Sequence, residues 1–493
     1  MNIGRTLRFM LVIFILSAVG NINTLAIEDE HEELFHPVEI TDGKVLSVTD
    51  CVALAFKNSP KIRRQKYNLD LAKSNVGIAK SQYFPVLSAG VGFYNENNSN
   101  GIYYDKHYRD LPNVGVSVNQ LIWNFGKTTA FIKMEEFYKI AAEYEFMDSL
   151  CLTLFDIKAK YYNLLRAKAL LNVAKNNQDI NEEYVKLAKN KNEADKTTAQ
   201  VNLSEANIKY IEAENTLNNA KYDLSNAMYL ENQPNYDIEI TPTFTYNVYA
   251  YRSKHVEMMP FEPFIFPFKK TEAPEIAYNN SPDLQVLVNT KKAMEQSLKY
   301  AKRAILPDLN ANVGYGYKNT NFARNNGLSV GVNLETTTNF MEYKYQGKNA
   351  QAQLNIADNE ITLFKKDLYY EVQRAFNNVD RAQKQVPTAK TEVEQSLINL
   401  TLVEKKYKSN ELDYIALQEA RKAYIRALDT YIESIYNYNI ALIQVEMAMH
   451  YHLVDIHHKS EHAMHYHSAE LIEHLNKVLG CDEKEISNKK KSK

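Results

Sequence analysis

The chain contains one long segment twice. The stretch "AFKNSPKIRRQKYNLDLAKSNVGIAKSQYFPVLSAGVGF" begins at Ala55, and "AYNNSPDLQVLVNTKKAMEQSLKYAKRAILPDLNANVGY" begins at Ala277, 222 positions later. The two align without a gap and share an Asn-Ser-Pro triplet, an Ala-Lys pair and a second proline. Chance does not supply both prolines at one spacing together with the same pattern after them. We therefore treat the chain as an internal duplication whose halves have the same fold.

Each copy predicts a helix followed by a strand. Ser59 is placed as a helix N-cap, and Pro60 follows at the first helical position, where its missing N–H costs nothing. A helix of roughly six turns follows and ends at Pro85, because the residue before a proline disfavours the helical region. Ser281 and Pro307 occupy the same places in the second copy.

Beyond the second proline of each copy, apolar residues alternate with Ser, Asn and Gly, and a partner segment of the same kind follows a polar loop. Strict alternation predicts a β-strand with one apolar and one polar face. Each half therefore predicts a two-stranded hairpin. The predicted apolar positions are Leu87, Ala89, Val91, Val114, Val116 and Val118 in the first half, and Leu309, Ala311, Val313, Leu328, Val330 and Val332 in the second.

After each hairpin the apolar residues recur every three or four positions, which is typical of a long coiled-coil-like helix. We expect these helices near 127–191 and 348–408, with a bend at Pro387 in the second. Return helices are expected at about 197–229 and 415–450. The predicted fold class is mainly α with a small β part.

Both long helices are followed by similar four-residue motifs, "NEAD" and "NELD". Asparagine tolerates the left-handed conformation that a tight helix reversal needs. The acidic residues have two open interpretations: they cap the return helices, or they form an acidic constriction that attracts cations and repels anions in a pore. The residues concerned are Asn192, Glu193, Asp195, Asn410, Glu411 and Asp413.

Four strands per chain cannot close into a barrel with a usable bore, and an open edge in hydrocarbon leaves backbone groups unsatisfied. Three copies would supply twelve strands around a water-filled lumen. Packing within a soluble sheet is the alternative for the apolar face. Aromatic residues near the strand ends favour the membrane, because such rings form interfacial girdles. They are Phe93, Tyr94, Tyr103, Tyr104, Trp123, Tyr315, Tyr317, Phe322 and Phe340.

Composition excludes several classes of function. A formal net charge of -2 over 493 residues gives no reason to expect nucleic-acid binding. Three cysteines cannot all pair, and none of the common catalytic or phosphate-binding motifs occurs, so we expect neither an enzyme nor a cofactor. Residues 1–26 carry two arginines before a short apolar run, which predicts a secretory signal, with an uncleaved anchor as the alternative.

Histidines gather near the C-terminus. Eight of the twelve lie between His450 and His474, and His458, His462 and His465 have helical spacing. Such a tail either binds a metal ion or is a solvated segment with incidental histidines. The metal-binding interpretation remains an alternative function, and no metal ligands are assigned from the sequence.

The chain resembles the TolC-like outer membrane efflux channels. The resemblance rests on five segments: "LSVTDCVALAFKNSP", "YFPVLSAGVGF", "ILPDLNANVGY", "QLIWNFGK" and "YKSNELDYIALQEARKAY". The order of these motifs along the chain and their duplication make the resemblance specific. It implies a homotrimer with a twelve-stranded outer-membrane β-barrel and a periplasmic α-barrel. It also implies a passive exit duct whose partners are a periplasmic adaptor (membrane fusion) protein and an inner-membrane pump. Asn192 and Asn410 would then mark the periplasmic tips, where the duct is gated and the adaptor docks.

The rival hypothesis is a periplasmic coiled-coil scaffold or adaptor without a pore, which has no need for lipid-compatible strands. We expect the following organisation of the chain: 1–26 signal peptide, 27–45 N-terminal extension, 46–230 first repeat, 231–275 inter-repeat equatorial segment, 276–452 second repeat, and 453–493 His-rich and basic tail.

Overall fold

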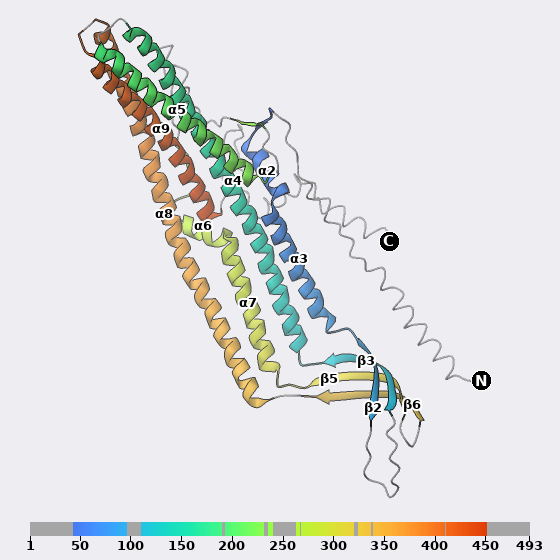
Figure 1. Cartoon of the computed structure of the whole chain (residues 1–493). Helices are drawn as coiled ribbons and strands as arrows, with labels where there is room; N and C mark the ends of the chain where they lie inside the picture. Colours follow the sequence, from blue (N-terminus) through green and yellow to red (C-terminus); the bar gives the residue numbers. More distant parts are fainter. Residues whose placement is uncertain are drawn as a thin grey trace, which may run out of the picture.

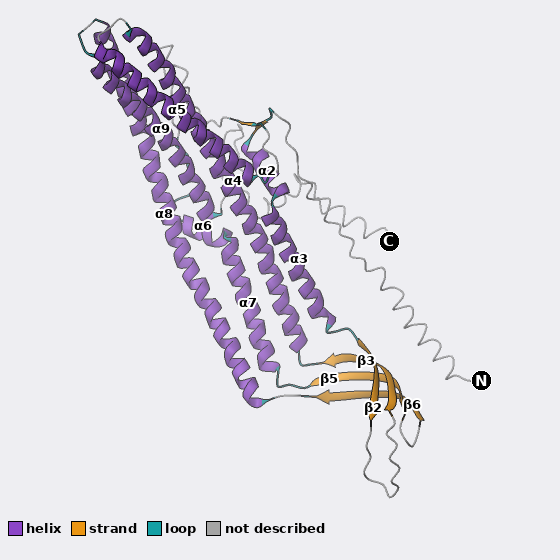
Figure 2. Cartoon of the chain, viewed as in Figure 1, coloured by secondary structure: helices purple, strands orange, loops and turns teal. Residues whose placement is uncertain are grey.

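The computed structural model describes residues 43–95, 110–189, 193–230, 235–239, 263–266, 268–319, 324–336, 339–409 and 411–450. Long helices run side by side, and a four-stranded sheet lies at one end of them (Figures 1 and 2). The helices are α2 (Val48–Asn58), α3 (Pro60–Ser81), α4 (Lys127–Ala188), α5 (Glu193–Ala227), α6 (Ala273–Asn280), α7 (Pro282–Arg303), α8 (Phe340–Lys408) and α9 (Tyr414–Met449). The strands are β1 (Val45–Leu46), β2 (Val86–Asn95), β3 (Asp110–Trp123), β4 (Asp237–Ile238), β5 (Asp308–Asn319) and β6 (Arg324–Glu335).

The two halves repeat one arrangement, which confirms the duplication. The long helix α4 packs against α3 and α5, and the long helix α8 packs against α7 and α9. Figure 1 shows each pair of shorter helices lying end to end along its long partner. At 1.5 Å per residue, the 69 residues of α8 extend about 104 Å. Helix α4 also packs against α7 and α9, and these contacts join the halves.

The predicted caps are present in both copies. The Ser59 hydroxyl accepts a hydrogen bond from Ile62 N at 3.3 Å, and the Ser281 hydroxyl accepts one from Leu284 N at 3.2 Å. A proline occupies the first helical position after each serine. Both helices end four residues before the second proline, and in both copies a strand begins directly after that proline.

Helix α8 begins eight residues earlier than the sequence pattern predicts. Asn339 is its N-cap, and the side-chain oxygen accepts a hydrogen bond from Met341 N at 3.0 Å. The apolar residues of the first turn, such as Phe340, are exposed. The first turn therefore lacks the helical spacing of buried apolar residues by which a helix is predicted from sequence. Figure 1 draws α8 as one helix that continues through Pro387.

The core lies in the half of the molecule away from the sheet, where α4, α5, α8 and α9 come together. Its fully buried side chains include Leu164, Val372 and Ile432. A partly buried ion pair crosses this core: Lys158 Nζ of α4 lies 2.7 Å from Glu446 Oε2 of α9. Within the ranges that the structure describes, none of the helices is both long and apolar enough to cross a membrane.

Short elements surround the middle of the bundle. Strands β1 and β4 form a parallel pair. The hydroxyl of Tyr161 on α4 donates to the carbonyl of Leu46 in β1 and to that of Glu239, directly after β4. Phe266 and Phe268 of the inter-repeat segment pack against Phe376 of α8. The described part of this segment is therefore attached to both halves at mid-length.

Removing one repeat cap is expected to have a small, measurable effect. Ser281→Ala should lower the free energy of unfolding by about 1 kcal/mol, because a buried helix start loses its side-chain acceptor. The shift is read from the midpoint of denaturant unfolding in detergent. Ser74→Ala, an exposed serine inside α3, is the matched control and should stay within about 0.5 kcal/mol. Equal effects of the two changes would contradict the capping role.

Candidate functional site

The four-stranded sheet has one largely apolar face. Its order is β2-β3-β5-β6, and all neighbours are antiparallel. Leu87, Val118, Val313 and Val330 pair with one another in a single row that crosses all four strands. The register places all twelve predicted apolar positions on this face, and Val330 is 71% exposed there. Such a face needs a partner that is absent from a single chain.

The opposite face carries small, uncharged residues over its centre. Ser88, Ser117, Gly314 and Ser329 form one cross-strand row. The next row consists of glycine on every strand: Gly90, Gly115, Gly316 and Gly327. Because these side chains are short and polar or absent, this face projects little into the space beside it and is compatible with water.

The two halves are tied together where the helices meet the sheet. Gly126 has a φ of 77°, a left-handed conformation that suits glycine, and a Cβ there would lie 2.7 Å from the Arg303 guanidinium. Arg303 donates a hydrogen bond to the Gly126 carbonyl at 2.9 Å. Lys127 Nζ lies 2.7 Å from Asp308 Oδ1 at the start of β5. These contacts orient the hairpin of one half relative to the other.

Exposed aromatic side chains gather at the same junction. Phe84, Trp123 and Phe340 are 67%, 57% and 73% exposed, and each lies where a helix joins a strand. Trp123 and Phe340 are among the aromatic residues predicted from the sequence, whereas Phe84 and its neighbour Tyr83 are not. Their position directly before Pro85 was the available signal. Tyr103, Tyr104 and Phe322 lie outside the described residues.

At the other end, an aromatic cluster joins three helices. The ring centroid of Tyr414, at the start of α9, lies 6.1 Å from that of Tyr184 on α4 and 6.1 Å from that of Tyr407 on α8. Tyr414 is almost fully buried, and its hydroxyl accepts a hydrogen bond from Gln418 Nε2. The Tyr184 hydroxyl donates to Glu404 at 3.3 Å. We call these residues, together with Arg421 and Asn177, the tip cluster.

Arg421 is the charged member of the tip cluster. Although it is only 2% exposed, its Nη2 donates to the backbone carbonyl of Asn177 at 3.1 Å and to the Asn177 side-chain oxygen at 3.2 Å. The guanidinium carbon lies 5.2 Å from the Tyr184 ring centroid, within range for a cation–π contact. Arg421 could not be predicted from the sequence, because a lone arginine in an amphipathic helix gives no signal of burial.

The predicted tip carboxylates have different surroundings. Asp413 is the N-cap of α9 and accepts a hydrogen bond from Ala416 N at 2.9 Å, whereas Glu411 accepts one from the Ser409 hydroxyl at 2.8 Å. Glu193 pairs with Lys196 one turn further on. Asp195 lies near the Tyr407 hydroxyl, whose pKa is raised first by burial and second by that carboxylate. Asn192 and Asn410 lie outside the described residues, as do His458, His462 and His465.

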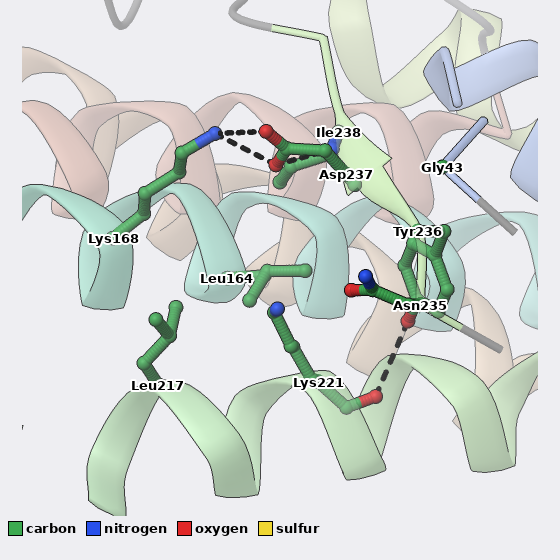
Figure 3. Close-up of a pocket in the computed structure, with 9 residues that line it drawn as sticks. All are labelled: Gly43, Leu164, Lys168, Leu217, Lys221, Asn235, Tyr236, Asp237 and Ile238. Atoms are coloured by element: carbon green, nitrogen blue, oxygen red, sulfur yellow. Dashed lines mark hydrogen bonds and ion pairs between the residues drawn. The ribbon is translucent and has the colours of Figure 1, made fainter. Parts of the chain in front are cut away.

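A cavity of about 280 Å³ lies at mid-length between α4, α5 and β4 (Figure 3). Lys168 Nζ lies 2.7 Å from Asp237 Oδ1, and Tyr236 donates to the Lys221 carbonyl at its edge. Burial opposes ionisation of Asp237, but hydrogen bonds from Lys168 and the Ile238 N–H outweigh it, and its pKa is lowered. The contacts of Lys168 with Asp237 and of Tyr236 with the Lys221 carbonyl attach the inter-repeat segment to the bundle, so we assign the cavity to the scaffold (Figure 3).

Comparison with solved structures identifies the fold. The chain is similar to the Campylobacter jejuni CmeC outer membrane channel, with 16% identity, 82% of this chain and 85% of that chain covered, and a TM-score of 0.68. It is also similar to the outer membrane protein VceC of Vibrio cholerae, with 13% identity, 82% of this chain and 95% of that chain covered, and a TM-score of 0.66. A third similar structure is the open state of the Neisseria gonorrhoeae MtrE outer membrane channel. The identity is 13%, the match covers 82% of this chain and 88% of that chain, and the TM-score is 0.63.

No protein with a curated description matches the chain by sequence. The sequence does match the family described as outer membrane efflux protein, over residues 52–228 and again over 273–449. The two matched ranges correspond to the two halves of the fold, and together they cover most of the chain. The chain therefore belongs to the outer membrane efflux protein family, whose channels lie in the outer membrane and extend helices into the periplasm.

Proposed function

We propose that three copies of the chain close one twelve-stranded barrel, with the apolar sheet face toward lipid and the Ser/Gly/Asn face toward water. The assembly is a passive exit duct without catalysis of its own. The observation that carries this proposal is the set of cross-strand rows, which separates exposed Val and Leu side chains from a face of small polar residues. Outer-membrane barrels show the same separation.

Unpaired strand edges support closure by several copies. In the described sheet, β2 and β6 each pair on one side only. Their outer edges would leave backbone donors and acceptors unsatisfied in hydrocarbon, at a cost of several kcal/mol for each group. Pairing β6 of one copy with β2 of the next removes both edges. The lipid-facing residues under this proposal are the twelve apolar positions from Leu87 to Val332 named above.

We place the gate at the end of the helices away from the sheet. The hairpin of α4 and α5 and the hairpin of α8 and α9 touch there through the tip cluster, so moving one hairpin away from the other must break the Arg421 contacts. Glu193, Asp195, Glu411 and Asp413, with Asn192 and Asn410 beside them, are the proposed surface for docking a periplasmic adaptor. Since a duct supplies no energy, we propose that an inner-membrane pump drives export through that adaptor.

We propose that the chain is divided into two repeats and a segment between them. Residues 46–230 and 276–452 are the two repeats, and 231–275 is an equatorial segment. The contacts of β4 with β1 and of Phe266 with Phe376 support that role for the inter-repeat part, because they lie at mid-length and far from both ends of the bundle.

Reconstitution tests this function directly. The purified full-length protein should form stable trimers in detergent and give discrete single-channel currents in a planar bilayer. Under a salt gradient we expect a preference for cations, because the proposed tip surface carries four carboxylates per chain. A monomer recovered from the soluble periplasm, without channel activity, would instead support the scaffold hypothesis. Channels that prefer anions would contradict only the role of the tip carboxylates.

A further inference from the structure

Three potential metal ligands from both halves of the chain meet at mid-length. Asp148 lies in α4, Asp283 is the second residue of α7, and His450 is the C-cap of α9. Each offers one ligand atom, and these atoms all lie within 4.8 Å of one another. Figure 1 shows α9 ending beside α6, close to where α7 begins. We call these three residues the junction cluster.

His450 is the most buried member of the junction cluster, whereas Asp148 and Asp283 are partly exposed. His450 is only 9% exposed. Its Nδ1 and Asp148 Oδ1 are both buried and make no hydrogen bond with any residue in the described part of the chain. A buried polar atom without a partner is uncommon in native structures and indicates a missing water, ion or proton. The unpartnered atoms here belong to the two side chains that converge with Asp283.

The charges of the junction cluster favour a cation. Burial, followed by the charges of Asp283 and Glu145, raises the pKa of Asp148 to about 7. Burial also raises the pKa of Asp283 and lowers that of His450 to about 4, which keeps the imidazole neutral. Two adjacent carboxyls in a poorly solvated place repel each other when both are ionised. A divalent cation would neutralise them while a neutral imidazole nitrogen completes the donor set.

The backbone holds the histidine in an unusual conformation. His450 has φ 45° and ψ 38°, a left-handed geometry that glycine or asparagine usually adopts at the end of a helix. Its N–H bonds to the carbonyl of Met447 at 3.2 Å, which closes the last turn. This geometry fixes the direction in which the imidazole leaves α9.

We propose that Asp148, Asp283 and His450 bind a divalent transition-metal ion of the Zn²⁺ class, which clamps α4 to the start of α7 and the end of α9. Carboxylate oxygen and imidazole nitrogen are common zinc ligands, with bonds of about 2.0–2.2 Å. Ligands at that distance from one ion lie about 3.5 Å apart, so the ligand atoms, which lie within 4.8 Å of one another, need to approach by at most about 1.3 Å. The resulting site has no net charge, which suits its partly buried position.

The site is distinct from the histidine-rich tail, and the experiment must separate the two. We would use the full-length chain with the seven histidines from His452 to His474 changed to glutamine, stripped with a chelator and titrated with Zn²⁺ in a calorimeter. One equivalent per chain is expected, together with a rise in the thermal unfolding midpoint, because an ion that binds only the folded state stabilises it. Co²⁺ in place of Zn²⁺ should give a visible absorption band.

Variants then assign the ligands. In the same background, Asp148→Asn and His450→Gln should each weaken Zn²⁺ binding by at least about 10–100-fold and remove the thermal shift. Asp429→Asn is the matched control, because Asp429 is another poorly solvated carboxyl, with its pKa raised by burial to about 6, and lies outside the junction cluster. This control should bind Zn²⁺ as the background chain does.

Two results would overturn the site. One is the absence of Zn²⁺ uptake by the background chain at neutral pH, which would mean that the carboxyls only share a proton. The other is unchanged uptake in both ligand variants. Trimer formation and helix content, measured on every variant, separate a lost ligand from a misfolded chain. Channel currents test the duct independently, so loss of the metal site and failure of the proposed function are distinguishable.

Discussion

Val330→Arg is expected to abolish assembled channels in the outer membrane. Val330 lies near the middle of β6 in the row it shares with Val313, Val118 and Leu87, and its side chain is mostly exposed. An arginine on the lipid face near the bilayer midplane costs about 2–4 kcal/mol, and every copy in a trimer carries it. The amount of heat-dissociable trimer in outer-membrane extracts is the measurement.

The neighbouring residue supplies the matched control. Ser329→Arg places the same side chain one position away, on the opposite face, where Ser329 pairs with Gly314. Substitutions that face a lumen alter selectivity and leave insertion intact. We therefore expect normal amounts of trimer and a reduced single-channel conductance for cations. Equal loss of trimer in both variants would show that the two faces do not differ in their surroundings.

Arg421→Leu is expected to open the duct. The change keeps an apolar contact with Tyr184 but removes two charge-assisted hydrogen bonds to Asn177, and such bonds contribute about 1.5–3 kcal/mol each. Losing even one shifts a closed-to-open equilibrium by about 10–150-fold in favour of the open state. In a planar bilayer, the mean current at fixed voltage should rise, and the time spent closed should fall.

Arg426→Leu is the control for charge. Arg426 lies on the same helix and lines one polar pocket together with Arg421 and Asn177, but its side chain is exposed. Its removal lowers the positive charge of α9 as much as Arg421→Leu does, without breaking a described contact between the helical hairpins. Currents like those of the unmodified channel are expected. If both variants open the duct equally, the electrostatic field rather than the tip cluster holds it shut.

Much of the architecture could be predicted because it follows from local rules. The caps at Ser59 and Ser281 depend on a serine followed by proline, and the faces of the strands depend on alternation. The start of α8 could not be predicted in the same way. Its cap, Asn339, precedes an exposed turn, and a hydrophobic seam reports only the part of a helix that is packed against another.

The candidate sites likewise differ in whether neighbouring residues or long-range packing determine them. The acidic tip residues lie in the similar motifs NEAD and NELD, so the sequence indicates them. In the structure Asp413 caps α9, which is one of the two interpretations given above. Arg421 and Asn177 are 244 positions apart, and no periodicity in either helix relates them. The same holds for Asp148, Asp283 and His450, which lie in three different helices.

By itself, the sequence determined the duplication, the order of helices and hairpins, and which residues of each strand share a face. These properties depend on backbone preferences and on the period of apolar residues, both of which act over a few neighbouring positions. Only the tertiary structure decided which row of β3 pairs with which row of β5, where a buried arginine joins the two helical hairpins, and that two aspartates and a histidine converge at mid-length. Those outcomes depend on how far each long helix is shifted along its neighbours, which the packing of side chains hundreds of positions apart determines.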